Sequence, residues 1–147
     1  MPKLSACIQE KRIILHLQAL KKMEAIRELA MRLEGADEIA DVKRFLSLVI
    51  QREKIETTAV GHGVAIPHAH GDCVGSLVIG VGISRQGIDF GAADGEAVRV
   101  IVIIASPVRS TTPGVFFSVA TRPFGTFMIM SISPARNAFR RWLPSGM

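Results

Sequence analysis

The sequence predicts an α/β fold in which a mixed β-sheet is flanked by helices. Helical periodicity dominates the first third of the chain, and short β-type runs replace it from Thr57 onward. One of these runs, "AVRVIVIIASP", is so uniformly apolar that it should be a strand covered on both faces. Helices followed by strands around such a central strand are typical of a layered α/β structure.

Length and composition indicate a cytoplasmic protein built around one domain. A chain of 147 residues can bury a core without disulfides or a metal. Its two cysteines, Cys7 and Cys73, and an N-terminus without signal character are typical of a reduced, cytosolic protein. No apolar run approaches the roughly 20 residues of a membrane span, so no membrane insertion is expected.

The net positive charge of the chain comes entirely from its last third. Residues 1–96 hold 12 basic and 13 acidic side chains, whereas residues 97–147 hold six basic and no acidic ones. A nearly neutral body with interspersed signs is an ordinary solvated surface. Nucleic-acid binding is therefore not predicted.

The first third predicts one strand and two helices. "KRIILHLQAL" opens with a strand-like run, and "KKMEAIRELAMRLEG" switches to helical spacing that Gly35 ends. A second helix is expected from about Asp41 to Arg52, with Asp37 or Asp41 as its cap. The two buried stripes are expected at Met23, Ile26, Leu29, Ala30 and Leu33, and at Val42, Phe45, Leu46, Val49 and Ile50. Both helices are expected to be scaffold.

The β segments that follow are "GVAIPHAH", "SLVIGVGIS" and the central apolar run. The Asp94-Gly95 pair favours a tight turn before that run. Gly61 and Gly63 flank His62 and allow the backbone to turn sharply there.

Two histidines interrupt the first of these segments. Successive side chains of a strand alternate between its faces, so His68 and His70 should emerge on the same side. Pro67 has no backbone donor, which favours a sheet edge or a strand end. The pattern therefore predicts two imidazoles close together near the surface.

These histidines are open to three interpretations. They can be ordinary surface residues of a loop. They can also bind a metal together with His62, and Asp72 and Cys73 are near in sequence, but no spacing completes a familiar ligand set. The third interpretation is nucleophilic catalysis, because a partly neutral imidazole can attack phosphorus.

The stretch "QREKIETTAVGHGVAIPHAH" resembles the active-site signature of the fructose/mannitol-type IIA domain of the bacterial phosphoenolpyruvate-dependent phosphotransferase system (PTS), a family that includes nitrogen-regulatory IIA proteins. The matching features are "REK", the Gly-X-Gly-Val-Ala-Ile-Pro-His core and, downstream, "GIDFGAADGEAVRVIVIIASP". The resemblance runs from about Leu4 to Pro107. Residues 1–107 are therefore expected to form a PTS IIA type 2-like domain.

The resemblance implies that His68 is the phosphoryl acceptor, presented at the surface by Pro67 as the strand ends. It makes Arg52 the group that stabilises the phosphate and transition state, although an arginine facing its own helix C-terminus is the structural alternative. His70 is a candidate helper, and backbone N–H groups near Gly61 to Gly63 are further candidate donors.

The function implied is that of a cytoplasmic phosphocarrier. It accepts phosphate from an HPr-like protein and passes it to a IIB domain or uses it to act on a regulatory target, with the nitrogen-regulatory branch favoured. The chemistry of imidazole-to-imidazole transfer requires no cofactor and no metal. The alternative is a binding module with the same fold that docks partners without transferring phosphate.

Residues 108–147 depart from the family, whose members continue with a second histidine and acidic helices. This tail has no histidine and no Asp or Glu, and four prolines with no sustained helical period predict that the C-terminal helices are missing or altered. Shifting the reading frame by one nucleotide restores acidic residues across Met128 to Ser133 and a histidine or tyrosine codon across Ser110 and Thr111 under suitable codon choice. We hypothesise a frameshifted tail; the alternative is true divergence. Loss of covering helices would leave an apolar sheet face through which the chain could self-associate.

Overall fold

The computed structural model describes residues 4–108, 114–122 and 125–133. Residues 1–108 and 109–147 form two separate compact units, and each is described by itself. Within the described residues, no helix is both long enough and apolar enough to cross a membrane.

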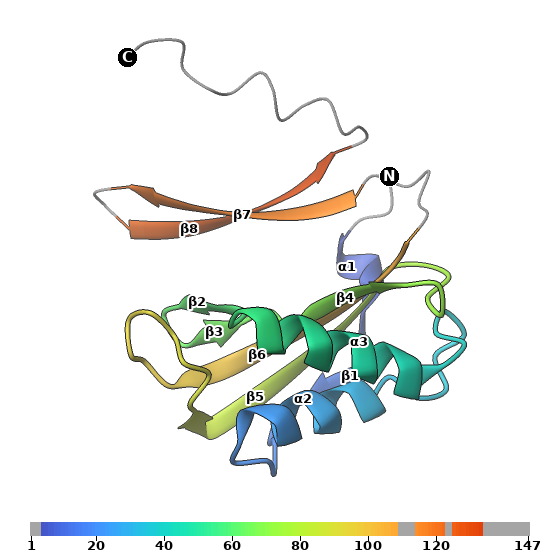
Figure 1. Ribbon diagram of the computed structural model, residues 1–147, viewed down its shortest axis with the longest axis horizontal. Helices are drawn as coiled ribbons and strands as arrows, with labels where there is room; N and C mark the ends of the chain where they lie inside the picture. Colours follow the sequence, from blue (N-terminus) through green and yellow to red (C-terminus); the bar gives the residue numbers. More distant parts are fainter. Residues whose placement is uncertain (1–3, 109–113, 123–124, 134–147) are drawn as a thin grey trace. The chain divides into compact units, whose positions relative to one another are not determined.

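The first unit is built on a six-stranded mixed sheet, as the sequence predicts (Figure 1). Its strands are β1 (Ile8–Ile14), β2 (Ala59–Gly61), β3 (Val64–Ala65), β4 (His68–Gly71), β5 (Val78–Ile88) and β6 (Val98–Pro107). The order is β1-β5-β6-β3-β2, and β4 also pairs with β6. β5 and β6 are antiparallel, whereas β1 is parallel to β5, and β3 and β4 are parallel to β6.

A short helix, α1 (Leu4–Cys7), precedes β1, and the two predicted helices are α2 (Lys22–Met31) and α3 (Val42–Ile55). The side chain of Asp41 accepts a hydrogen bond from the backbone N–H of Arg44 at 2.9 Å, which confirms it as the cap of α3. The helix α2 ends four residues before Gly35 because the chain tightens there into three-residue turns, and Gly35 itself has a left-handed φ of 80°.

The core lies between these helices and one face of the sheet (Figure 1). Both predicted stripes are confirmed, except that Met23 and Ile50 are only partly buried at the margin of the core. The sheet contributes Ala65, Ala69, Val78, Ile101, Ile103 and Ala105 to the same cluster. These small and β-branched side chains let α3 pack closely over β4.

The opposite face of the sheet is also apolar. The pairs Ile79↔Ile104, Val81↔Val102 and Ile83↔Val100 lie on it. Ile79 and Ile104 are buried, whereas the other four are half-buried. The strand β6 is thus fully covered on its helical face and incompletely covered on the other, which corrects the expectation of a strand buried on both sides.

The strand β3 ends at Ala65 and β4 begins at His68, so the ladder is interrupted at Ile66 and Pro67. The pairs Val64↔Val100 and His68↔Ile104 keep one register along β6, so the chain resumes pairing directly after the proline. Pro67 cannot donate to the ladder, but its carbonyl accepts from the N–H of Ile104 at 3.0 Å and holds the register. Among the described residues β4 pairs only with β6, so the predicted edge position is confirmed.

The second unit contains an antiparallel hairpin of β7 (Gly114–Arg122) and β8 (Gly125–Ser133), paired from Gly114↔Ser133 to Arg122↔Gly125. Strands rather than helices agree with the absence of helical periodicity in this part of the sequence. Ser110 and Thr111, which enter the frameshift hypothesis, lie outside the described residues. The frameshift and the domain boundary at Pro107 stay predictions.

Candidate active site

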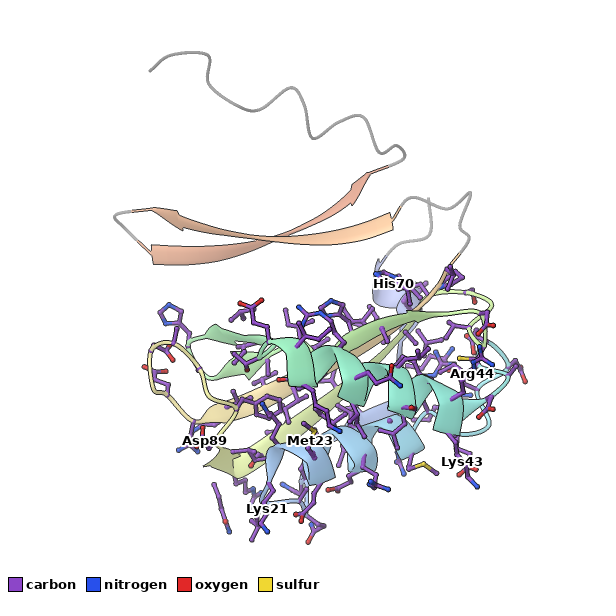
Figure 2. All side chains as sticks on the ribbon, in the orientation of Figure 1. Lys21, Met23, Lys43, Arg44, His70 and Asp89 are labelled. Carbon is purple, nitrogen blue, oxygen red and sulfur yellow. The ribbon has the colours of Figure 1, made fainter. Side chains whose placement is uncertain are left out.

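His68 and His70 emerge on the same side of β4. Ala69 and Gly71 are buried between and after them, whereas His68 is half-buried and His70 exposed. The ring centroids are 6.4 Å apart and the rings meet edge-on at 70°. Figure 2 shows His70 at the margin of the first unit, beyond β4 as seen from α3. The alternation predicted from the sequence is confirmed.

The backbone fixes the tautomer of His68. Its Nδ1 lies 2.9 Å from the carbonyl oxygen of Ile66. A carbonyl only accepts, so the hydrogen bond requires Nδ1–H. In the neutral ring the lone pair then lies on Nε2, which makes Nε2 the nucleophilic atom of this imidazole.

His70 is held by a side chain of the neighbouring strand. Its Nδ1 lies 2.5 Å from the hydroxyl oxygen of Ser106, the residue directly opposite it in the β4/β6 ladder. Desolvation of the ring lowers the pKa of His70, and the charge of His68 lowers it further. His70 is therefore predominantly neutral near pH 7.

Arg52 lies in the last turn of α3 and is half-buried. Its Nη1 donates to the backbone carbonyl of Glu56 at 3.0 Å, at the C-terminal end of its own helix. This contact matches the structural alternative weighed for Arg52. Its role toward phosphate stays a prediction.

The helix that carries Arg52 packs on β4. Leu48, one turn before Arg52, lies against Gly71, where an added Cβ would come within 2.9 Å of the leucine Cδ1. Ala69 belongs to the core beneath the helices, so His68 and His70 point to the other side of β4 from the helix that carries Arg52.

The glutamate of "REK" is a structural residue that sequence reasoning missed. Glu53 is 2% exposed, and its carboxylate accepts from the backbone N–H of Thr58 at 3.1 Å and from the Thr58 hydroxyl at 2.5 Å. Lys22 forms an ion pair with it at 3.4 Å. Glu53 follows Val49 by four residues, so its position in the buried stripe of the helix was the available signal.

The hydroxyl groups of both threonines after α3 are used inside the protein. Thr57 donates to the carbonyl of Phe90 at 2.6 Å, and Thr58 binds Glu53. The carbonyl of Thr58 accepts from Ile66, the residue whose own carbonyl holds His68. A chain of contacts therefore runs from Glu53 to the orientation of His68.

The turn from Gly61 to Gly63 does not serve the histidine site, which corrects the prediction that its N–H groups are phosphate donors. All three residues have left-handed φ angles, and the N–H of His62 is taken by the carboxylate of Asp94 at 2.8 Å. From Val64 to His68 the strand spans about 13 Å, so the turn lies at the other end of the ladder. Asp94 is a clamp for the turn, and donation from His62 and Glu96 lowers its pKa.

The same separation removes His62 from any shared metal site. Asp72 forms an ion pair with Arg44 at 2.9 Å, and Cys73 is buried with a raised pKa caused by desolvation. In the described part of the chain no three His, Cys, Asp or Glu residues gather as a metal site would require. These residues therefore give the metal interpretation no support.

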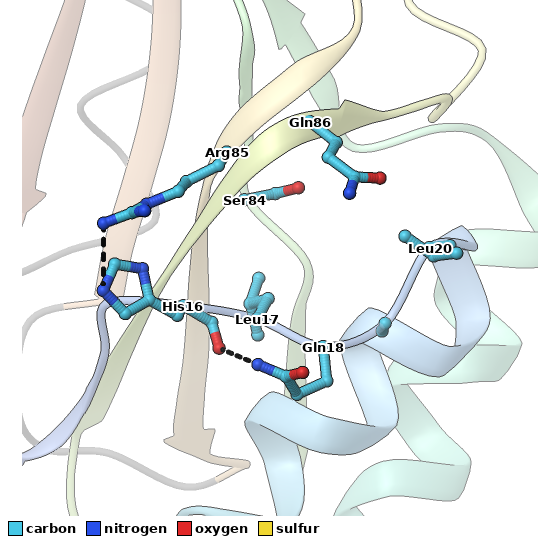
Figure 3. A pocket seen from close by; sticks show the side chains of 8 residues that line it. His16, Leu17, Gln18, Leu20, Ser84, Arg85 and Gln86 are labelled. Carbon is cyan, nitrogen blue, oxygen red and sulfur yellow. Dashed lines mark hydrogen bonds between the residues drawn. The ribbon is translucent and has the colours of Figure 1, made fainter.

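A cavity of about 250 Å³ lies between the β1–α2 loop and the end of β5 (Figure 3). Arg85 and His16 point toward each other there, and the guanidinium Nη2 lies 3.3 Å from Nε2 of His16. The register places neighbouring Ser84 about 16 Å along β5 from Ile79, which is level with His68. His16 belongs to this separate region, not to the histidine pair.

Comparison with known proteins places the chain among phosphotransferase components. The family described as "Phosphoenolpyruvate-dependent sugar phosphotransferase system, EIIA 2" matches residues 6–118, which extends past the boundary between the two units. The fructose-like EIIA component of Escherichia coli (strain K12) is 32% identical over 95 residues, which cover 65% of this chain and 64% of that protein. A nitrogen regulatory protein of Bradyrhizobium diazoefficiens is 36% identical over 97 residues, which cover 62% and 61%.

The chain spans only part of the relatives that it matches. It covers 16% of the fructose-specific EIIABC component of Bacillus subtilis (strain 168), with 28% identity over 104 residues. Among solved structures, the nitrogen regulatory protein IIA-Ntr from Neisseria meningitidis superposes with a TM-score of 0.68 at 26% identity, covering 74% of this chain and 73% of that one.

The E. coli mannitol IIA in complex with phosphorylated IIB has a TM-score of 0.61 at 23% identity, covers 68% and 70%, and shows the fold alone. The family match covers most of the chain and coincides with the described mixed sheet and its two helices. The chain therefore belongs to the EIIA type 2 family of the phosphoenolpyruvate-dependent sugar phosphotransferase system.

Proposed function

We propose that this chain is a phosphocarrier in which Nε2 of His68 accepts a phosphoryl group from an HPr-like protein. The observation that carries the proposal is the hydrogen bond from Nδ1–H of His68 to the Ile66 carbonyl, which directs the lone pair to Nε2 on a partly exposed face. Membership of the EIIA type 2 family supports the same role.

The phosphoryl group passes directly from one imidazole to the other. The bond between phosphorus and the donor nitrogen breaks as the bond to Nε2 of His68 forms. The ring of His68 becomes positively charged, and the carbonyl of Ile66, which accepts from Nδ1–H, stabilises that charge. Because an imidazole leaves and another attacks, the exchange is close to balanced, and the protein mainly aligns the groups.

Arg52 is proposed to bind the equatorial oxygens. It lies in the last turn of the helix that packs on β4, and its planar fork suits phosphate once it releases the carbonyl of Glu56. The test is Arg52→Gln against Lys54→Gln, an exposed cation two residues away on the same helix. Slower phosphorylation in the first variant alone supports the role, and equal rates in both contradict it.

We propose that the protein acts in the cytoplasm and that it acts on a regulatory target of the nitrogen branch. The likeness to two nitrogen regulatory proteins supports this choice, while the fructose-like relative supports a IIB domain. Rapid transfer of label to a IIB domain would favour the sugar branch. The comparisons do not support self-association, which forms no part of the proposal.

The experiment uses the full chain with enzyme I, HPr and labelled phosphoenolpyruvate. Acid-labile, base-stable label is expected on the native protein and is lost in His68→Ala. His16→Ala is the matched control, because it removes a histidine outside the pair. Absence of label on a folded native chain would refute the carrier and leave the non-transferring binding module.

A further inference from the structure

We propose that Ser106 is a positioning residue for phosphoryl transfer, whose hydroxyl holds His70 in the tautomer with Nε2–H, the one able to donate to a phosphoryl group on His68. This inference rests on the proposed function of His68. Ser106 lies outside the sequence motif around His68, which therefore gives no indication of its role.

The first step is the placement of Ser106 on the interior strand of the sheet. Ser106 lies in β6, directly opposite His70, and its hydroxyl oxygen is 2.5 Å from Nδ1 of that ring. Residues opposite each other in a ladder share a face, so the hydroxyl reaches the ring without bending either strand. The contact joins the edge strand β4 to β6, which pairs with other strands on both sides.

The second step is the direction of that hydrogen bond. Phosphoryl oxygens only accept, so His70 can bind them through an N–H and is repelled by them through a lone pair. A neutral His70 that donates from Nε2 has its lone pair on Nδ1. The Ser106 hydroxyl can donate or accept, and we propose that it donates to this lone pair.

The third step is the contrast with His68. The carbonyl of Ile66 sets His68 to Nδ1–H, which leaves its Nε2 nucleophilic. In the proposed arrangement the hydroxyl of Ser106 donates to Nδ1 of His70, which keeps the proton of His70 on Nε2. Two adjacent histidines of one face thereby acquire different chemistry, one as acceptor of phosphorus and the other as donor to its oxygens.

The spacing of the rings fits this division. The two imidazoles form an edge-on pair with ring centroids 6.4 Å apart, so a group bound to one ring lies close to the other. His70 is predominantly neutral before transfer because desolvation and the charge of His68 lower its pKa. Its tautomer, rather than its charge, therefore decides whether it assists.

The experiment compares the native chain with Ser106→Ala, Ser106→Thr and the control Ser47→Ala, an exposed serine of α3. The chains are phosphorylated with enzyme I, HPr and labelled phosphoenolpyruvate. Because Ser106 acts through His70, its loss is expected to slow phosphorylation about tenfold, less than the loss of a direct transition-state donor. Ser106→Thr should restore the rate. Nuclear magnetic resonance of the His70 ring should show Nε2–H in the native and Thr chains and a mixture in Ser106→Ala.

The outcomes separate the two proposals. Absence of label on the native chain overturns the role of His68 and that of Ser106 with it. Normal labelling with an unchanged rate and unchanged His70 tautomer in Ser106→Ala overturns the positioning role alone. Acid-stable, base-labile label that depends on Ser106 also overturns it, because the hydroxyl would then itself accept phosphate.

Discussion

Replacement of Glu53 by alanine should destabilise the first unit by about 3–5 kcal/mol. The change removes two charge-assisted hydrogen bonds to Thr58, each worth about 1.5–2 kcal/mol. It leaves the N–H and hydroxyl of Thr58, which is 6% exposed, without their acceptor. Lys22 is 26% exposed at its side chain, so solvent takes over much of the lost ion pair.

Urea unfolding of the full chain, followed by circular dichroism, measures this loss against Glu56→Ala. Glu56 is an exposed glutamate directly after α3, and its replacement should change the free energy of unfolding by about 0.5 kcal/mol or less. Thr58→Val should cost about 1–2 kcal/mol, and the double variant less than the sum of the two single ones. A Glu53→Ala chain within 1 kcal/mol of the native protein would contradict the assigned role of this carboxylate.

The remaining predictions concern a charge, a close contact and the tail. A hydrogen bond from its own backbone amide, followed by Arg12, lowers the pKa of Glu38 below 4.5, so its ionised form stabilises the fold above that pH. This contribution disappears as the pH falls through the lowered pKa, and acid titration of stability should be steeper in the native chain than in Glu38→Gln; equal slopes would contradict it. Gly71→Ala should cost about 1–3 kcal/mol, because its Cβ would meet the Leu48 Cδ1 at 2.9 Å and the Cys73 Sγ at 3.0 Å. Leu48→Ala should reduce that penalty, and a neutral Gly71→Ala chain would refute the packing argument. Sequencing the coding DNA should reveal a single-base insertion or deletion near codon 108 whose correction gives an acidic, helical continuation; an intact frame refutes the frameshift.

What the sequence could predict depends on whether the information is local. The shared face of His68 and His70 follows from the period of a strand, and the cap at Asp41 follows from helix-terminus chemistry. The contact of His70 with Ser106 joins residues 36 positions apart and requires the register of β4 on β6, which no local pattern gives. Glu53 follows the buried Val49 by four residues, which is the spacing of the buried face of the helix. Its charged neighbours Arg52 and Lys54 instead suggested a solvated helix end.

The segments β3 and β4 keep one register along β6 but carry different features. Before Pro67 the strand begins at a left-handed turn clamped by Asp94, and after it the strand bears the histidine pair. Pro67 removes one ladder donor, but the register of the chain on β6 is the same before and after it. The proline therefore affects only the backbone directly before His68. Residue 66 then provides a carbonyl to the ring of His68 while its N–H remains paired with Thr58.

The position of His70 beside His68 suggests what could replace a histidine that the tail lacks. The family resemblance implies a second histidine in the tail, where this chain has none, while the ring centroids of His70 and His68 lie 6.4 Å apart and Ser106 contacts His70. If His70 supplies the donor that the tail lacks, its contribution must depend on which tail is present. Replacing His70 by alanine should therefore slow phosphorylation strongly in the chain as it stands and weakly in a frame-corrected chain that regains a tail histidine. Equal effects in both backgrounds would show that His70 does not compensate for the altered tail.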